Sequence, residues 1–588
     1  MLGTPAWQVN RDLKATEQAK AIDLGRKLLA DYATAMTPDL ERAILTANAP
    51  AIVHNIEQRT PGWTATNVML VYVRSATRAH ERSNVLSEVL FNRAVKQAMD
   101  LDAQFEETGK IVGPLHGVPV SIKDQVDIEG VDTTMGLTHK INRPASTDAT
   151  LIRVIREAGG IPFVKSNVPQ TMLSFECSNP LFGASRNPYD PERITGGSSG
   201  GEGGLLGSDG SPLGIGSDIG GSLRIPSHFS GCFAIKPCVP RIASTGCQSF
   251  NAGFTAIQST MGPMGRSVAD LELLLRVQLD AAPALAATEG VLPLPYRDVT
   301  LPKKLRFGYF TQDGFCRTSP ACERAVLETV EALRREGHEC VEFEPPSALE
   351  AMEYFVALTS AGRYETLLSH LLEDPREPSL FLVTIGPRLP AIVRATLAWL
   401  LESVVGDAKF ARLIRASQGR SVREMQEWQH RREVYVRAGR KLMWEHHGFD
   451  AVLCPPQATP ALKHGETKNL SPLAIATVHW NVLDSTVGLV PVTRVSPALD
   501  ALSPAFRDAL RTAPGSSLVE KSVYGAAGAG GGVYDADAMA GLPVGVQVVG
   551  RLWDEERIVE VMKVVDAALG PRGFGPGEFA KRDKERVY

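Results

Sequence analysis

Hydrophobic positions near the start of the chain recur at helical spacing. Residues 10 to 107 are mostly helical in pattern, and apolar residues return every three or four positions in SNVLSEVLFNRAVKQAMDLDAQFEETG, residues 83–109. We therefore expect residues 1–107 to form a mainly helical layer packed on the remainder, residues 108–588.

The pattern changes from Gly117 onward. GVPVSIKD alternates apolar and polar positions as a strand does, LIRVIREAGG has the pattern of a helix closed by glycine, and IPFVKSN resembles a second strand. LRFGYF, ACERAVLETVEALRREG and CVEFE repeat the strand, helix, strand order in the second half. Alternating strands and helices predict an α/β fold, and one continuous domain is the simplest arrangement.

Composition and charge narrow the function classes. The 588 residues contain 62 basic and 66 acidic side chains, a formal charge of -4, which argues against a nucleic-acid partner. The eight cysteines are scattered without C-x-x-C pairs or zinc-ligand spacing, so we expect reduced thiols and no metal. The N-terminal segment resembles neither a signal peptide nor a membrane span, and a cytoplasmic location is the default expectation.

A glycine- and serine-rich region follows, from Thr195 to Gly221. GGSSGGEGG and GIGSDIGG lack the spacing of a dinucleotide fingerprint, no G-K-[ST] follows, and no basic residue is at hand for a phosphate, so no nucleotide cofactor is expected. Residues 196–200 match the letters of a G-x-S-x-G elbow, which would make Ser198 a nucleophile. That elbow needs an apolar strand directly before it, whereas NPYDPERIT precedes it here.

A lysine offers another way to activate a serine. Lys123 lies near the end of an apolar strand, where burial could lower its pKa enough for it to accept a proton. A lone lysine at a strand end is ordinarily a surface charge. The residues around it must decide between these interpretations.

The decisive pieces are GPLHGVPVSIKD, SNVPQTMLSFECSNPLFGASRNPYD, GGSSGGEGG, GSPLGIGSDIGGSLRIPS and MGPMGRSVADLELLL. Together they resemble the amidase signature family over about 113–270, with weaker similarity to about residue 566. Within it the chain is most similar to the branch of fatty acid amide hydrolases and eukaryotic general amidases. The resemblance implies a large mixed, mostly parallel central β-sheet covered by α-helices on both faces.

The resemblance also implies a Ser-cisSer-Lys triad, with Ser222 as nucleophile, Ser198 after a cis peptide as proton relay and Lys123 as base. Ser199 is the second choice for the relay. Consecutive backbone N–H groups in the glycine-rich turn would form the oxyanion hole, with Asp218 and Arg224 ordering the loop. The implied oxyanion-hole residues are Ile219, Gly220, Gly221 and Ser222. Two departures, Ser217 in place of threonine and KPCVPR in place of the commoner KPT-x-GR, remove no catalytic group.

The implied substrate is a carboxamide with an apolar or fatty acyl group. Met172 and Ser174 would line the substrate site beside Ser198, although core packing is the competing interpretation. A general short-chain or aryl amidase, or a carbamate or ester hydrolase, could use the same triad. A glutaminase subunit of a tRNA amidotransferase would also use this triad, but with a polar pocket and a partner surface. A binding protein without catalysis would require damage to the triad or the glycine turn, and all are intact.

Two later segments complete the expectations. Residues 381–405 are apolar but broken by Gly386, Pro387 and Pro390, so they should not span a bilayer. Their position resembles a membrane-facing helical hairpin, which predicts peripheral, one-leaflet contact with Trp399 near the headgroups, although a buried helix or a dimer contact would also explain them. Residues 497–540 resemble a surface loop insertion, to which we assign no chemistry. A homodimer is common in the family, and the sequence does not test it.

Overall fold

The computed structural model describes residues 4–31, 36–512, 515–526 and 531–582. One eleven-stranded sheet, in the order β1-β3-β2-β4-β6-β5-β10-β11-β9-β7-β8, runs through the described chain. Its strands are β1 Leu86–Val89, β2 Pro119–Lys123, β3 Ile161–Ser166, β4 Leu213–Asp218, β5 Phe233–Lys236, β6 Thr260–Gly265, β7 Arg306–Tyr309, β8 Glu339–Glu342, β9 Ala451–Cys454, β10 Val487–Arg494 and β11 Pro543–Val549.

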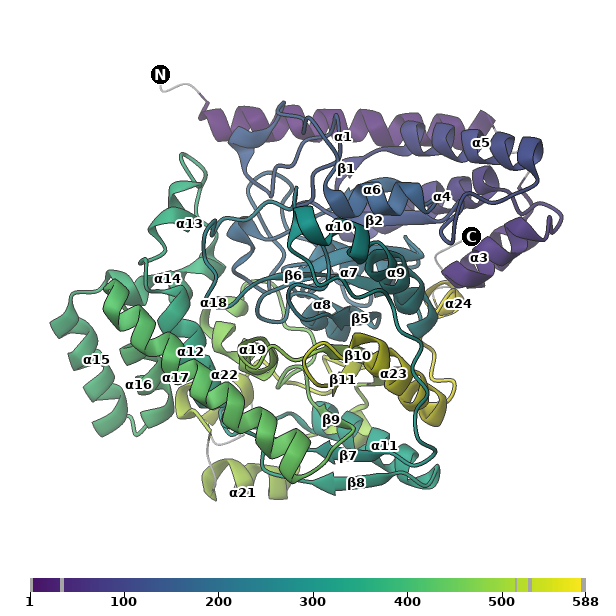
Figure 1. Cartoon of the computed structure of the whole chain (residues 1–588). Coiled ribbons are helices and arrows are strands. Elements are labelled where there is room, and N and C mark those ends of the chain that lie inside the picture. The colour runs from purple at the N-terminus through teal and green to yellow at the C-terminus, as the bar shows by residue number, and fades with distance from the viewer. Residues whose placement is uncertain (1–3, 32–35, 513–514, 527–530, 583–588) are drawn as a thin grey trace.

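Helices cover this sheet, which confirms the predicted α/β class (Figure 1). Those of the first half are α1 Ala6–Asp31, α2 Pro38–Thr46, α3 Ala49–Glu57, α4 Ala65–Ser83, α5 Phe91–Thr108, α6 Thr150–Glu157, α7 Gly200–Gly207, α8 Arg224–Ser230, α9 Val268–Asp280 and α10 Ala282–Glu289. Those of the second half are α11 Pro320–Arg335, α12 Ala348–Thr359, α13 Glu365–Ser369, α14 Phe381–Ile385, α15 Ala391–Ser403, α16 Ala408–Ala416, α17 Val422–Arg440, α18 Thr467–Leu470, α19 Ile475–Val482, α20 Pro497–Asp500, α21 Pro504–Thr512, α22 Ser517–Tyr524, α23 Glu555–Leu569 and α24 Glu578–Arg582.

The expectation of a mostly parallel sheet is wrong. Between described strands, β2 pairs in parallel with β3 and β4, and β7 with β8 and β9. The other six neighbouring pairs are antiparallel. A parallel pair of consecutive strands needs a crossover, which α6 supplies between β2 and β3 and α11 between β7 and β8, as the sequence pattern predicted. The middle of the sheet, from β4 through β9, is built without such units.

The N-terminal layer departs from the helical expectation at one place. The helical pattern across residues 83–109 is broken, because α4 ends at Ser83, Asn84 adopts a left-handed φ of 50°, and β1 intervenes before α5 begins at Phe91. β1 pairs antiparallel with β3 and so covers that edge of the sheet. The first 107 residues therefore contribute a strand to the central sheet as well as helices.

Residues 497–540 are not a loop where the structure describes them. They contain α20, α21 and α22, and Phe506, Leu510, Val519 and Tyr524 are buried in the main core. The many glycine, serine and alanine residues concealed the helical spacing of these apolar side chains in the sequence. Residues 527–530, within the AAGAGGG run, lie outside the described residues.

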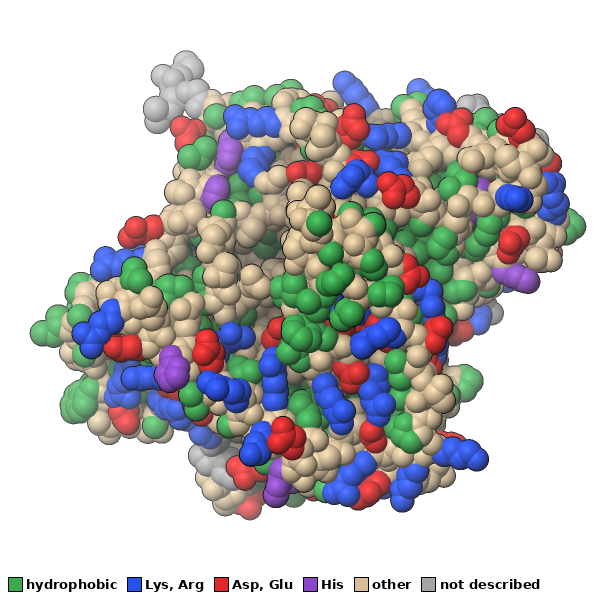
Figure 2. All heavy atoms as spheres, viewed as in Figure 1, with side chains coloured by type: hydrophobic (Ala, Val, Ile, Leu, Met, Phe, Trp, Pro, Cys, Tyr) green, Lys and Arg blue, Asp and Glu red, His purple; other side chains and the backbone are tan. Residues whose placement is uncertain are grey.

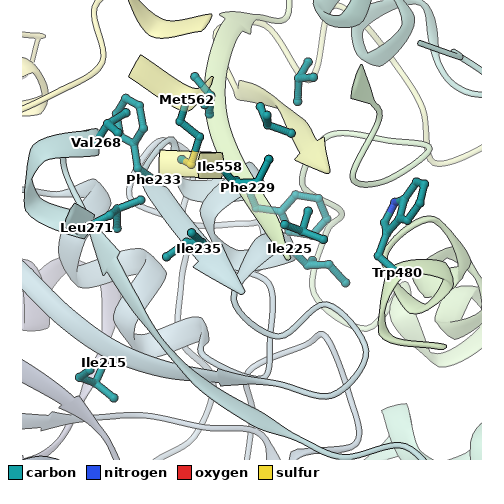
Figure 3. Packing of buried hydrophobic residues seen from close by; sticks show 14 of the residues in the cluster. Ile215, Ile225, Phe229, Phe233, Ile235, Val268, Leu271, Trp480, Ile558 and Met562 are labelled. Carbon is teal, nitrogen blue, oxygen red and sulfur yellow. The ribbon is translucent and has the colours of Figure 1, made fainter. Parts of the chain in front are cut away.

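The core and the glycine-rich helix α7 position the site. Side chains from β4, α8, β5, α9, α19 and α23 meet in one buried cluster (Figure 3). α7 is buried along its whole length, and a Cβ added at Gly201 would lie 2.3 Å from the backbone nitrogen of Asn167. The glycines of GGEGGLLG thus permit backbone-to-backbone packing, which fixes the turn that precedes the helix.

Candidate active site

Lys123 ends the fully buried strand β2 and lies at the centre of the site. Its Nζ donates to Ser198 Oγ at 2.7 Å and to Ser217 Oγ at 2.8 Å. Ser217 comes from β4, the parallel neighbour of β2, and its hydroxyl donates to Gln125 Oε1 at 2.6 Å. The lysine is therefore held in the interior by two hydroxyl groups and has no carboxylate within hydrogen-bonding distance among the described residues.

The environment of Lys123 favours the neutral amine. Burial lowers the pKa of Lys123 to about 7, against the smaller opposing effects of Asp218, Cys177 and Glu202. Loss of hydration destabilises an ammonium group more than an amine, which is the physical cause of this shift. In a large fraction of the protein molecules, Lys123 is therefore neutral near pH 7 and can accept a proton.

The structure distinguishes Ser198 from Ser199. The peptide bond between Gly197 and Ser198 is cis, and Ser198 contacts the lysine. Ser199 instead donates through its hydroxyl to the carbonyl of Ser217 at 3.3 Å, and its backbone N–H donates to the carbonyl of Ser222 at 3.2 Å. Of the two serines, Ser198 therefore contacts Lys123, and Ser199 ties the neighbouring loops together.

Ser222 follows the turn that leaves β4, and 8% of its surface is exposed. The backbone N–H groups of Ile219, Gly220 and Ser222 have no acceptor within the described chain, and all three residues line the same cavity. The N–H of Gly221 differs, because it donates to Asp218 Oδ1 at 2.8 Å. Of the four expected oxyanion donors, three are free in this structure and the fourth is bound to a side chain.

Asp218 and Arg224 form a buried ion pair under this turn. Arg224 Nη2 lies 2.9 Å from Asp218 Oδ1, and both side chains are fully buried. Burial opposes ionisation of Asp218, but the charge and hydrogen bonds of Arg224 outweigh it and lower the pKa of this carboxyl group. The carboxylate also accepts the backbone N–H of Leu223 and the Asn481 amide. These bonds fix the loop on both sides of Ser222.

A large apolar cavity opens at Ser222. It contains about 1020 Å³ of empty space, part of it open to solvent, and Met172 and Ser174 both line it. Part of its wall comes from helices far away in the sequence. The lining side chains of these helices are Met352, Phe355, Val356 and Thr359 of α12, Leu382 and Val383 of α14, and Phe410, Leu413 and Ile414 of α16.

A second, more polar cavity meets the first at the serines. Ser198, Ser222, Met172 and Ile219 line it together with polar side chains of the 244–259 segment. These polar side chains are Ser244, Gln248, Ser249, Asn251 and Ser259. Ser222 therefore lies at the junction of an apolar and a polar space.

Sequence reasoning missed part of this site. It noted Ser217 only as a replacement for the commoner threonine, whereas Ser217 accepts a hydrogen bond from Lys123 and donates one to Gln125. The signal for both was proximity to the motifs, since Gln125 follows Lys123 by two residues. In the described ranges, no group of three or more His, Cys, Asp or Glu side chains could hold a metal ion.

Comparisons with known proteins identify the family of this chain. The family model described as Amidase matches residues 67–559. The chain belongs to the amidase family. It is 34% identical over 514 residues to fatty acid amide hydrolase 1 of Caenorhabditis elegans, covering 86% of each chain, and 33% identical to fatty-acid amide hydrolase 1 of Sus scrofa, covering 91% of this chain and 88% of that one. A solved fatty acid amide hydrolase superimposes with a TM-score of 0.79 at 26% identity, covering 97% of this chain and 91% of the other.

The protein is accordingly an amide-hydrolysing enzyme, as the motifs predicted. Relatives with other names are almost as similar. An acetamidase of Aspergillus oryzae is 30% identical over 519 residues and covers 86% of each chain. Family membership thus establishes the bond that is cleaved, and the acyl group must be inferred from the cavity.

Proposed function

We propose that this amidase hydrolyses amides of long apolar acyl groups through a triad of Ser222, Ser198 and Lys123. The observation that carries the proposal is the hydrogen bond of 2.7 Å from Lys123 Nζ to Ser198 Oγ, together with Ser222, which lines a large apolar cavity. A buried amine with a pKa of about 7, a serine hydroxyl hydrogen-bonded to it and a second serine that lines the same polar cavity provide the parts of an activated serine.

In the first step, neutral Lys123 accepts the proton of the Ser198 hydroxyl, which reverses the direction of their hydrogen bond. Ser198 takes the proton of the Ser222 hydroxyl as Ser222 Oγ attacks the amide carbonyl carbon. The same proton returns along this path to the leaving nitrogen, the C–N bond breaks and an acyl-enzyme remains. Water, deprotonated through the same relay, then attacks the ester, and the carboxylic acid leaves as Ser222 regains its proton.

The negative charge on the tetrahedral intermediate needs donors. The unpaired N–H groups of Ile219, Gly220 and Ser222 supply them, and each such donor contributes about 3 kcal/mol. The Asp218–Arg224 pair holds these groups in place before the substrate arrives, so little reorganisation accompanies the reaction.

The two cavities suggest how the substrate is oriented. Burial of an alkyl chain yields about 0.8 kcal/mol per methylene, so the apolar cavity favours a long acyl group. The polar cavity suits the amine portion, because its hydroxyl and amide side chains can replace water around a leaving group. The names of the nematode and pig relatives, both fatty acid amide hydrolases, favour a fatty acyl group.

The decisive experiment is active-site labelling with a fluorophosphonate and peptide mapping by mass spectrometry, alongside hydrolysis of acyl amides of increasing chain length. We expect the label on Ser222 and kcat/KM that rises with acyl length. Label on Ser198 would contradict the assigned order of the triad. Label on Ser222 with a preference for short or aryl acyl groups would retain the triad and support the alternative of a general amidase, which the acetamidase relative favours.

We also propose that the bent helix pair around 381–405 contacts a membrane surface. Among the described helices, none alone is long and apolar enough to cross a bilayer, whereas the pair Pro378–Arg388 and Ala391–Ser403, bent by 111°, meets that criterion by length and composition only. Figure 2 shows hydrophobic side chains on the surface at the left edge, over α15. The exposed large hydrophobic residues of this segment are Phe381, Ile392, Val393, Leu397, Trp399, Leu400, Val404 and Val405.

The position of this segment supports the proposal. α14 belongs to the bent pair, and its Leu382 and Val383 line the apolar cavity. Apolar substrate could therefore pass from a lipid surface into the cavity along α14. A homodimer and a cytoplasmic location stay predictions from the sequence.

A further inference from the structure

One buried carboxyl group near the triad has no place in the mechanism above. Glu202 lies in the first turn of α7, four residues after Ser198, and its side chain is fully buried. Its Oε2 accepts a hydrogen bond of 2.6 Å from the hydroxyl of Ser121. Its Oε1 and the buried hydroxyl of Ser166 form no hydrogen bond of standard geometry in the described part of the chain, although the Ser166 hydroxyl acts on this carboxyl group and lowers its pKa. An ionised carboxylate is poorly stabilised by so few donors.

The strands bring this carboxyl group to the face of the sheet that carries Lys123. Ser121 precedes Lys123 by two positions on β2, so their side chains point to the same face. On the adjacent strand β4, a Cβ added at Gly214 would lie 2.2 Å from Glu202 Oε2 and 2.7 Å from Ser121 Oγ. The absence of a side chain at Gly214 therefore makes room for Glu202.

Few charges act in this region. Among the described residues, Lys123 is the cation whose charge acts on Glu202, and burial raises the pKa of this carboxyl group to about 7. The other groups that act on Lys123 are Asp218 of β4 and the thiol of Cys177, and Glu202 also acts on the thiol of Cys232. Asp218 is paired with Arg224. Glu202 is thus the acid near Lys123 without a cationic partner of its own.

We propose that Glu202 is a positioning residue that controls how readily Lys123 holds a proton, from a buried place beside Ser121 and Ser166 that Gly214 leaves open. An ionised Glu202 favours the ammonium form of Lys123, and a protonated Glu202 favours the amine. The pair of Glu202 carboxylate and Lys123 ammonium contains the same number of protons as the pair of Glu202 carboxylic acid and Lys123 amine. A proton that moves from Lys123 to Glu202 therefore produces the neutral base without loss of a proton to solvent. This inference rests on the proposed role of Lys123 as base.

The test is the pH dependence of kcat/KM for Glu202→Gln. The amide keeps the shape of the side chain but cannot become an anion, so the pKa of Lys123 should fall. We expect the acid limb of the profile to move down by a few tenths of a pH unit, and activity near pH 7, where Glu202 of the wild-type enzyme is partly ionised, to rise about 1.5-fold relative to the alkaline plateau. Ser121→Ala should move the limb in the same direction by a smaller amount, because loss of its hydroxyl makes the Glu202 anion less favourable. It provides the test if the glutamine variant does not fold.

Glu88→Gln is the matched control. Burial also raises the pKa of Glu88 to about 7, but its partner is Lys14, at 2.7 Å. The acid limb of the kcat/KM profile of Glu88→Gln should therefore stay where it is in the wild-type enzyme. A uniform loss of activity at all pH values in Glu202→Gln, with an unmoved limb, would show a purely structural role and overturn the inference, as would an equal shift in the control. Lys123→Met distinguishes failure of the triad from failure of the role of Glu202. Full activity of Lys123→Met would overturn the triad itself. Loss of activity in Lys123→Met, together with an unmoved acid limb in Glu202→Gln, would overturn only the role of Glu202.

Discussion

The pH dependence of hydrolysis tests the lowered pKa of Lys123 directly. If Lys123 is the base, only its neutral form supports turnover, and kcat/KM reports the free enzyme. Burial lowers the pKa of Lys123 to about 7, so acidification should protonate the base and reduce the rate. Because only the neutral amine is active, kcat/KM decreases as the pH falls through the pKa of Lys123 and reaches its maximum above that pKa.

The magnitude follows from the neutral fraction. A base with a pKa of about 7 is about one tenth neutral at pH 6 and about nine tenths neutral at pH 8. We therefore expect kcat/KM to rise about tenfold over this range and then to level off. An ordinary exposed lysine, with a pKa of about 10.4, would produce an approximately 100-fold rise over the same range without a plateau.

The assay is initial-rate hydrolysis of a long-chain acyl p-nitroanilide from pH 5.5 to 9.5, with folding checked by circular dichroism at each pH. Lys123→Met should lower kcat/KM by about 10²- to 10⁴-fold and abolish the acid limb. A log-linear rise through pH 9 in the wild-type enzyme would show that Lys123 is not tuned as inferred. A flat profile would remove it as the base.

Three further predictions concern other parts of the site. Ser198→Ala should lower kcat about 10²- to 10⁴-fold, whereas Ser199→Ala should retain most activity in the same assay, and the reverse order would reassign the relay. Asp218→Asn leaves the buried charge of Arg224 uncompensated and should reduce the free energy of unfolding by about 3–5 kcal/mol in urea titration, so an unchanged midpoint would contradict a role in stability. Ile392 is 77% exposed on α15, and Ile392→Glu should weaken cosedimentation with lipid vesicles about tenfold. Hydrolysis of a short-chain amide should stay the same, and unchanged cosedimentation would count against the membrane surface.

Local patterns in the sequence predicted the two crossover units well. β2, α6 and β3 form one unit and β7, α11 and β8 the other, because alternation and amphipathic spacing are properties of neighbouring residues. The pairing of strands distant in sequence, such as β5 with β10, depends on tertiary packing, and the direction of these pairs was missed. The strand at Leu86 was missed for the same reason, since its partner β3 lies about eighty residues later.

The site could be predicted as far as the motifs extend. Lys123, Ser198 and Ser222 lie in short segments of distinctive composition, and the structure brings Lys123 to Ser198 as the resemblance implied. The N–H of Gly221 was expected to be free, but its bond to Asp218 is a matter of backbone geometry that residue letters do not encode.

The acyl cavity illustrates why substrate choice is harder to predict than chemistry. The bond that is cleaved is determined by a few polar atoms whose spacing is fixed by β2, β4 and the turn at Ser222. The cavity wall depends on α12, α14 and α16, in which apolar residues such as Phe355 and Ile414 look like ordinary core positions in the sequence. A wall made of such residues can change in width by a single substitution without any effect on the triad. Amidases of this family with the same catalytic parts can therefore differ widely in acyl group, and the cavity in this chain provides the physical reason to expect a long one.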